Sequence, residues 1–323
     1  MKRYHSIGEL PLGGPRRAVA IGTFDGVHLG HQAIISRAIA LAGERGLRSM
    51  VVTFNPSPIK VLRPEVRTST LTGLALKCAL IERLGVDELL VVPFNRSFSR
   101  VRADRFVELL SRPPIGADAI VVGDGFRFGH GGIGTIDLMR DVGRSVGLAV
   151  EGTQLISSGD DKPISSTRIR RLIAQGHVEE AAGLLGRPHV LEGRVVRGDQ
   201  RGRAIGIPTA NVAVEPTDAA VPGKGVYAGV AVLAHGREPA AINIGVVPTF
   251  VEPASGPERP VFRVEAHLLD YSGPDLYDQS VRLELHGRVR DERRFGGADE
   301  LVAQIREDIL VIRSMLEVEG EGG

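Results

Sequence analysis

Two histidines three residues apart, His28 and His31, are the side chains of this sequence best placed to do chemistry. They lie in a glycine-containing segment, Gly22–His31, which we call the histidine loop. The loop follows the apolar run Ala18–Ile21, which predicts a buried strand, and precedes a helical apolar spacing over residues 31–44. Unpaired N–H groups and the dipole of a helix start attract phosphate, and imidazoles can donate hydrogen bonds to its oxygens. The pattern therefore predicts a phosphate site.

A metal site is the alternative interpretation of the two histidines, because imidazole is a common zinc ligand. The chain has a single cysteine, Cys78, and the sequence around the histidines holds no carboxylate cluster that would complete a ligand set. The position of the loop between a strand and a helix therefore favours phosphate over metal.

A second helix start with anion-binding character lies at residues 164–170, where hydroxyl side chains precede Arg168. Ser165 or Ser166 is the expected N-cap of a helix over residues 167–175. Hydroxyls, a helix start and a guanidinium together favour an anion. Taken alone, such a segment is more often an ordinary capped helix with basic surface residues.

Residues 197–211 form another dense segment, in which three glycines alternate with three arginines before the sequence Pro208–Asn211. Glycines allow the backbone to wrap a phosphate chain, and arginines add positive charge. Without further information, the segment is also compatible with a solvated turn between two strands.

The elements that must position these residues differ between the two halves of the chain. Strand-like runs in the first half cover residues 18–21, 48–54, 88–92, 119–122 and 148–150, with helical patterns over 74–84, 103–110 and 136–146. This alternation predicts an α/β fold with a parallel sheet covered on both faces. Ligands of such sheets bind beyond the carboxyl ends of the strands, where the histidine loop begins.

The second half is typical of an antiparallel β-barrel. Short alternating strands, separated by Gly/Pro turns, cover residues 190–196, 225–233, 240–244, 261–268 and 281–285. A terminal helix over residues 298–316 is expected to pack on the barrel. We place the domain boundary near Gly186, which gives domains over residues 1–186 and 187–323.

Length and composition fit a globular protein with two cores, since 42% of the 323 residues are apolar and 24% are charged. The net charge of +1 gives no bulk electrostatic argument for a nucleic-acid or membrane partner. A single cysteine fits a reducing compartment, and we find neither a signal-peptide pattern nor an apolar run of membrane-spanning length. We therefore expect a cytoplasmic protein without nucleic-acid or membrane partners. Whether the protein forms a homo-oligomer is left open.

Taken together, the motifs resemble those of the prokaryotic bifunctional riboflavin kinase/FAD synthetase family over the whole chain. The histidine loop resembles the HxGH motif of nucleotidyltransferases, and residues 164–170 resemble the motif that accompanies it. Further similar segments are Phe54–Pro56, Val121–Gly123, Phe126–Gly129 and the PTAN motif Pro208–Asn211. The resemblance implies a Rossmann-like FMN adenylyltransferase domain that makes FAD, followed by a riboflavin kinase domain that makes FMN, both using ATP and Mg²⁺.

The same resemblance implies a role for each candidate residue. His28 and His31 would stabilise charge on the triphosphate, while Arg168 acts with Ser165, Ser166 and Thr167 on its distal phosphates. Further residues implied to bind nucleotide or flavin are Gly22, Phe24, Asp25, Gly30, Gly198, Arg201, Gly202, Gly206 and Arg290. Oxygens of Thr209 and Asn211 would help to hold Mg²⁺ on the ATP phosphates.

Riboflavin phosphorylation needs a general base for the ribityl 5′-hydroxyl, and the resemblance places it at Glu265. In the strand over residues 261–268, alternation puts Val264, Ala266 and Leu268 on one face and Arg263, Glu265 and His267 on the other. His267 is a competing base. A cross-strand ion pair with an arginine is the structural alternative for Glu265.

Two positions depart from the family pattern in the first domain. Ser57 stands where a histidine is usual, and Gly125 stands where asparagine or aspartate is usual. Two alternatives to the bifunctional enzyme stay open, and the departures motivate the first of them. One is a riboflavin kinase whose first domain binds nucleotide or flavin but adenylylates poorly, and the other is a flavin-binding regulatory or storage protein.

Overall fold

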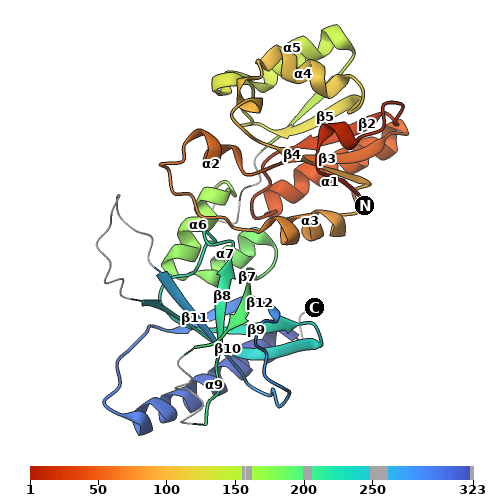
Figure 1. Cartoon of the computed structure of the whole chain (residues 1–323). Helices are drawn as coiled ribbons and strands as arrows, with labels where there is room; N and C mark the ends of the chain where they lie inside the picture. The colour runs from red at the N-terminus through yellow and green to blue at the C-terminus, as the bar shows by residue number, and fades with distance from the viewer. Residues whose placement is uncertain (155–156, 158–161, 199–205, 248–260, 321–323) are drawn as a thin grey trace. The chain divides into compact units, whose positions relative to one another are not determined.

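The computed structural model describes residues 1–154, 157, 162–198, 206–247 and 261–320. The chain forms two compact units (Figure 1). The first unit consists of Met1–Thr68 and Leu74–Ser166, and the second consists of Ser69–Gly73 and Thr167–Gly323. None of the helices in these described ranges is both long and apolar enough to cross a membrane.

A six-stranded parallel sheet organises the first unit. Its strands are β1 (Lys2–Tyr4), β2 (Arg17–Ile21), β3 (Arg48–Asn55), β4 (Glu88–Pro93), β5 (Ala117–Gly123) and β6 (Ala149–Thr153). Their order is β1-β4-β3-β2-β5-β6. The chain thus builds outward in one direction from β2 to β3 and β4, and in the other through β5 and β6. Such a reversal of strand order creates a crevice at the carboxyl ends of β2 and β5.

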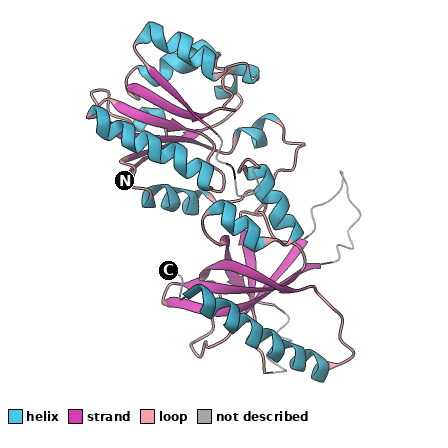
Figure 2. Cartoon of the chain, turned by 180° about the vertical axis from the view of Figure 1, so that it is seen from behind, coloured by secondary structure: helices cyan, strands magenta, loops and turns pink. Residues whose placement is uncertain are grey.

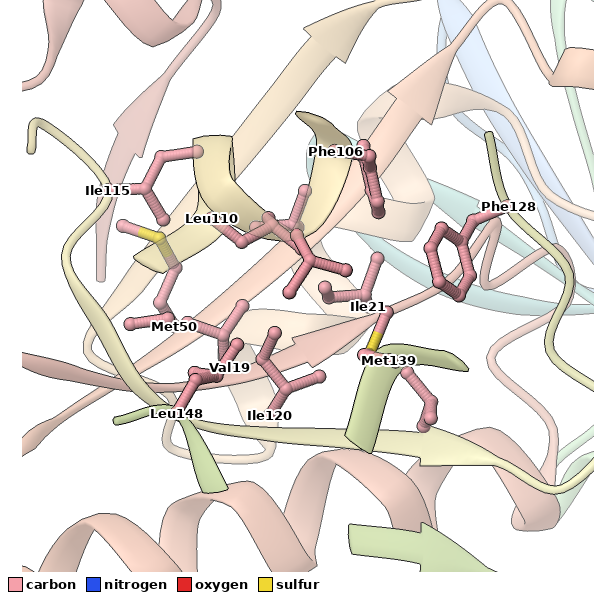
Figure 3. Close-up of a cluster of buried hydrophobic side chains, with 14 of the residues drawn as sticks. Val19, Ile21, Met50, Phe106, Leu110, Ile115, Ile120, Phe128, Met139 and Leu148 are labelled. Atoms are coloured by element: carbon pink, nitrogen blue, oxygen red, sulfur yellow. The ribbon is translucent and has the colours of Figure 1, made fainter. Parts of the chain in front are cut away.

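Helices cover both faces of this sheet (Figure 2). Its helices are α1 (Leu29–Arg45), α2 (Pro58–Leu62), α3 (Leu74–Arg83), α4 (Ala103–Ser111) and α5 (Ile136–Val146). Apolar residues of α4 and α5 form one core with the strands, including Phe106, Leu110 and Met139 (Figure 3). Apolar residues of α1 and α3 form a second core against the other face. The continuous apolar runs of the strands are therefore explained by burial on both sides.

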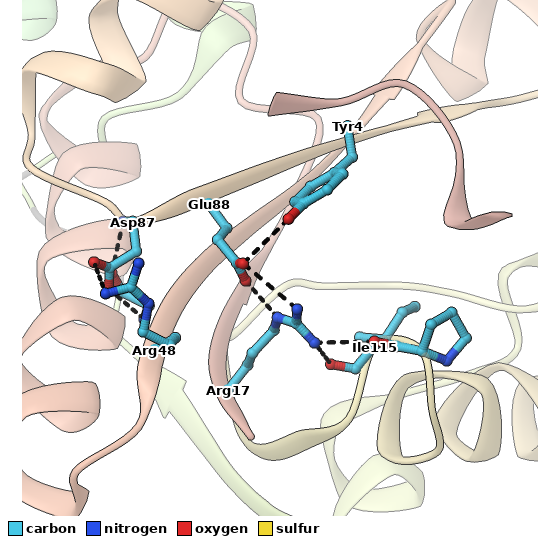
Figure 4. Close-up of polar contacts among 8 residues, drawn as sticks. Tyr4, Arg17, Arg48, Asp87, Glu88 and Ile115 are labelled. Atoms are coloured by element: carbon cyan, nitrogen blue, oxygen red, sulfur yellow. Dashed lines mark hydrogen bonds and ion pairs between the residues drawn. The ribbon is translucent and has the colours of Figure 1, made fainter. Parts of the chain in front are cut away.

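The amino ends of the strands, opposite the crevice, are held by buried charge (Figure 4). Arg17 opens β2 with a fully buried guanidinium that pairs with Glu88 at the start of β4. The same guanidinium donates to the carbonyl oxygens of Pro114 at 2.9 Å and Ile115 at 2.7 Å. Breaking a buried pair of this kind leaves an uncompensated charge, so this edge has a structural role.

The second unit is built around a closed antiparallel barrel. Its elements are α6 (Ser166–Gln175), α7 (Val178–Leu185), β7 (His189–Val196), β8 (Ala210–Glu215), β9 (Gly225–Leu233), β10 (Gly236–Val247), β11 (Val261–Leu268), β12 (Ser280–Arg290) and α9 (Ala298–Gly320). The strand order is β10-β11-β8-β7-β12-β9. The barrel core contains Val178 of α7, and α9 packs on β9, β10 and β12.

The predicted fold class is confirmed: a parallel α/β sheet is followed by an antiparallel barrel with a terminal helix. One barrel strand, β8, was not predicted as a strand, because its first residues belong to the PTAN motif. The compact units divide before Thr167, earlier in the chain than the domain boundary predicted near Gly186. The boundary near Gly186 stays a prediction.

A five-residue segment from the first half of the chain belongs to the barrel unit. Ser69–Gly73 lies between α2 and α3 in the sequence. The Thr70 N–H donates to the Asp218 carbonyl at 2.8 Å, and the Ala220 N–H donates to the Thr70 carbonyl at 2.8 Å. Arg170 of α6 donates from Nε to the Ser69 carbonyl at 2.6 Å. The second unit is therefore discontinuous in sequence.

Candidate functional site

The histidine loop places its two imidazoles against each other at the start of α1. His28 is the N-cap of this helix, and its Nδ1 accepts a hydrogen bond of 3.3 Å from the His31 N–H. The two rings stack with centroids 3.5 Å apart and an interplanar angle of 18°. Because Nδ1 is the acceptor, a neutral His28 ring carries its hydrogen on Nε2. The predicted hydrogen-bond donors thus lie together at a helix start.

Side chains from other elements hold the backbone of the histidine loop. Ser166 Oγ donates to the Asp25 carbonyl at 2.9 Å, and Gln32 Nε2 donates to the Val27 carbonyl at 2.9 Å. Gly30 packs closely on this loop, since an added Cβ would lie 3.3 Å from the His28 ring and the ring would have to shift slightly. The loop is thus preorganised by its surroundings.

The other predicted residues of the histidine loop are also placed by its packing. Gly22 follows β2 directly and donates its N–H to the Val52 carbonyl at 3.1 Å. The buried Phe24 ring meets the edge of His31, with centroids 5.3 Å apart. Asp25 is 8% exposed. Each therefore has a structural role, and its contact with nucleotide stays a prediction.

The second predicted phosphate motif brings Ser166 to the histidine loop. Helix α6 begins at Ser166, so Ser165 occupies the residue directly before it, where an N-cap was expected. The Ser166 hydroxyl donates to the loop backbone, so this side chain positions the loop. Thr167 and Arg168 continue the same helix within the second unit. Phosphate contacts of these four residues stay predictions.

A chain of phenylalanine rings follows the carboxyl ends of β3, β4 and β5. This cluster was not predicted from the sequence. Neighbouring ring centroids lie 5.4–6.3 Å apart among Phe54, Phe94, Phe98, Phe106, Phe126 and Phe128. Phe94 and Phe126 are half-buried and keep part of their surface exposed. Six of the ten phenylalanines of the chain thus form an apolar cluster at the same end of the sheet as the histidine loop.

The two departures from the family pattern have local room for change. Ser57 is the N-cap residue of α2, but its hydroxyl makes no capping hydrogen bond to the described helix. An added Cβ at Gly125 would meet no described atom within 4 Å. Larger side chains can therefore be introduced at Gly125 without an evident clash.

We expect Ser57→His combined with Gly125→Asn to raise FAD formation and leave FMN formation unchanged. One transition-state hydrogen-bond donor is worth about 10²–10³-fold in rate, which sets the upper range of the gain. The measurement is the rate of each product in the wild type and in the double variant. Rapid FAD synthesis by the wild type, with no gain in the variant, would show that other groups already fill these roles.

In the barrel, Glu265 lies between two asparagines on neighbouring strands. Glu265 of β11 is directly opposite Asn211 of β8 and Asn243 of β10. Residues directly opposite in an antiparallel pair share one face of the sheet. Val264 and Ala266, which flank Glu265, are each only 1% exposed, so the predicted alternation is confirmed. Among the residues that the structure describes, Glu265 forms no ion pair, and the cross-strand arginine alternative is not supported.

The segment before β8 packs against this face. Asn211 lies so close to the Gly198 backbone that an added Cβ there would clash with the Asn211 amide. His267 Nδ1 lies 2.8 Å from the Pro208 carbonyl oxygen. Since a carbonyl only accepts, this contact places a hydrogen on Nδ1 of His267. The competing base is thus tied to the backbone beside Thr209.

A cavity of about 240 Å³ opens beside Thr209 within the barrel unit. It is lined by rings and apolar side chains, among them Pro208, Leu268, Tyr271, Pro274 and Tyr277. The Arg197 guanidinium carbon lies 5.6 Å from the centre of the Tyr277 ring. The cavity therefore combines apolar side chains with the hydroxyl residue of the PTAN motif, and a cation lies against one of the rings that line it.

The remaining predicted residues of this unit have different surroundings. Arg290 forms a two-point ion pair with Asp308 of α9, with nitrogen–oxygen distances of 2.9 Å and 2.7 Å. This pair anchors the terminal helix, and a role of Arg290 toward flavin stays a prediction. Gly206 has a φ of +77°, which suits a turn. Arg201 and Gly202 lie outside the described residues.

Both halves of the chain thus have the features of nucleotide-dependent transferases: a Rossmann-like sheet with a phosphate-directed helix start, and a barrel with an oxygen-rich face beside a cavity. The family model for FAD synthetase matches residues 14–168, and that for riboflavin kinase matches residues 185–316. The chain belongs to the bifunctional riboflavin kinase/FMN adenylyltransferase family. The presence of both domains in one chain does not favour a monofunctional kinase.

Several relatives span nearly the whole chain. The bifunctional riboflavin kinase/FMN adenylyltransferase of Escherichia coli (strain K12) is 37% identical over 311 residues, which cover 96% of this chain and 95% of the relative. The protein of the same description from Bacillus subtilis (strain 168) is 39% identical over 298 residues, covering 91% and 90%. A crystal structure described as a macrolide-efflux protein from Streptococcus pneumoniae has a TM-score of 0.83 at 30% identity, covering 96% of this chain and 98% of that one. This likeness supports the fold.

Proposed function

We propose that the second unit phosphorylates riboflavin to FMN with ATP, and that the first unit adenylylates FMN to FAD with a second ATP. The observation that carries the proposal is that one chain holds both a stacked histidine pair at a helix start and a carboxylate directly opposite Asn211. A flavin storage protein would need neither arrangement.

For the kinase reaction, we assign the proton transfer to Glu265. The ribityl 5′-oxygen attacks the γ-phosphorus of ATP, its proton passes to the Glu265 carboxylate, and ADP leaves. The strand pairing holds Glu265 beside Asn211 of the PTAN motif, whose side chain lies against the Gly198 backbone. The cavity beside Thr209 has ring and apolar side chains in its lining, against which the adenine ring of ATP can pack.

For the adenylyl transfer, we assign His28 and His31 to the triphosphate. An FMN phosphate oxygen attacks the α-phosphorus, the bond to the bridging oxygen breaks, and pyrophosphate leaves. Positioning and electrostatic stabilisation provide the catalysis, because no covalent enzyme intermediate is needed. The half-buried ring of Phe126 offers an apolar surface for the flavin at the same end of the sheet.

Mg²⁺ fits the oxygen set of the kinase site. Thr209 and Asn211 offer a hydroxyl and an amide oxygen, and the described residues hold no cluster of three or more His, Cys, Asp or Glu side chains that would form an all-protein site. Mg²⁺ prefers few protein ligands together with waters and substrate phosphates. We therefore infer that Thr209 and Asn211 hold the ion on ATP, where it neutralises phosphate charge.

The proposed function is tested by incubating the purified protein with riboflavin, ATP and Mg²⁺ and separating the flavins by chromatography. We expect FMN to appear first and FAD to follow, and both reactions to stop when EDTA removes the metal. FMN without FAD would support the monofunctional kinase. Binding of riboflavin without either product would support a storage protein.

A further inference from the structure

Lys77 is a buried cation on α3 that lies outside every motif that the sequence analysis identified. It is 7% exposed, and its Nζ donates a hydrogen bond of 2.9 Å to the Thr23 carbonyl of the histidine loop. A lysine is seldom buried, because removing its ammonium from water is unfavourable unless a partner compensates. The burial of Lys77 therefore indicates that it has a role in the histidine loop.

The carbonyl that Lys77 binds precedes a strained stretch of backbone. Phe24 and Val27 have φ values of +46° and +43°, in the left-handed region that favours glycine. Such residues persist only where surrounding groups hold them in place. Thr53 Oγ1 of β3 donates to the same Thr23 carbonyl at 3.1 Å. Two donors from two different elements thus fix the point at which the loop turns.

A carboxylate of the histidine loop also acts on the charge of Lys77. Burial lowers the pKa of Lys77, and the carboxylate of Asp25 opposes this shift. The other titratable groups that act on it are Cys78 of the same helix and Lys60 of α2. The loop carboxylate therefore stabilises the charged form of the buried ammonium.

We propose that Lys77 is a positioning residue for adenylyl transfer, which holds the histidine loop in the conformation that presents His28 and His31 to the ATP phosphates. This inference rests on the FMN adenylylation proposed above. Lys77 acts through the backbone of Thr23 and does not need to touch either substrate.

The test is Lys77→Met, which keeps the length of the side chain but removes the donor and the charge. We expect kcat for FMN adenylylation to fall about 10²-fold, the effect of a small misplacement of reacting groups, with a much smaller change in the KM for FMN. Riboflavin phosphorylation in the same preparation should be unchanged. The thermal midpoint is expected to fall, because removing one member of a buried pair of charges is destabilising, so both activities are assayed well below it.

Two further variants separate positioning from packing. Cys78→Ala changes the next buried residue of α3 and should leave adenylylation near the wild-type rate. Lys77→Met with Thr53→Val should lose more activity than the two single effects combined, because both donors of one carbonyl are then gone. If the Lys77→Met protein does not fold, it is replaced by Lys77→Gln, which keeps a neutral hydrogen-bond donor.

Each outcome decides the role of Lys77. Adenylylation within threefold of wild type in the Lys77 variant would overturn it, as would an equal loss in Cys78→Ala. Equal losses of both enzyme activities together with the thermal midpoint would show a structural role only. If the wild type itself forms no FAD, the proposed adenylylation fails, and the role of Lys77 fails with it.

Discussion

Glu265→Gln is expected to lower riboflavin phosphorylation by about 10²–10⁴-fold, the usual contribution of a general base. Glutamine keeps the shape of the side chain and its place opposite Asn211, but it cannot accept the proton of the 5′-hydroxyl. Riboflavin binding should therefore persist. The measurement is the rate of FMN formation under saturating ATP, alongside riboflavin binding followed by flavin fluorescence.

His267→Gln is the matched control, because it removes the competing base from the same face of β11. Nδ1 of His267 is already engaged by the Pro208 carbonyl, so we expect a much smaller loss than in the Glu265 variant. FMN adenylylation should be unchanged in both proteins. Near-normal FMN formation by Glu265→Gln, or a greater loss in His267→Gln, would remove Glu265 from the role of base.

His28→Asn should lower FAD formation by about 10²–10³-fold, which is the value of one transition-state hydrogen-bond donor. We assign His28 two roles: Nδ1 caps α1, and Nε2, which carries the hydrogen of the neutral ring, is proposed to donate to phosphate. Asparagine is a strong N-cap residue, so it preserves the cap and removes only the second function. The assay is FAD formation from FMN and ATP.

His28→Ala removes both functions and serves as the comparison. It should lose a similar amount of FAD formation and, in addition, about 0.5–2 kcal/mol of stability from the missing cap. Chemical or thermal unfolding measures this difference between the two variants. A His28→Asn protein that still makes FAD at close to the wild-type rate would restrict His28 to capping the helix.

Elements with strong hydrophobic periodicity were predictable from the sequence. The helix over Ile136–Val146 and the strands over Gly225–Leu233 and Val261–Leu268 have the same bounds in the structure as in the prediction. In these segments the spacing of the apolar residues places them on a single buried face of the helix or strand. Strand β8 escaped prediction because Pro208 and the polar residues around Asn211 obscure the short alternation that follows them.

The candidate site was predictable where residues are adjacent in sequence, as in the histidine loop. Contacts between distant segments were not. Lys77 occupies a position in an amphipathic helix where lysine is normally solvated, and nothing in the local pattern indicates that it reaches Thr23. The bond from Ser166 to the Asp25 carbonyl likewise joins residues that are far apart in the sequence.

The discontinuity of the barrel unit limits how the chain can be divided by genetic means. A single break in the gene between residues 73 and 218 leaves Ser69–Gly73 on the fragment that carries the histidine loop, while its hydrogen-bonding partners Asp218 and Ala220 are on the other. Transferring the kinase half alone therefore removes the hydrogen bonds that the barrel unit makes with Ser69–Gly73. A modular exchange would have to supply those five residues separately, for example as an added peptide or through a circularly permuted gene.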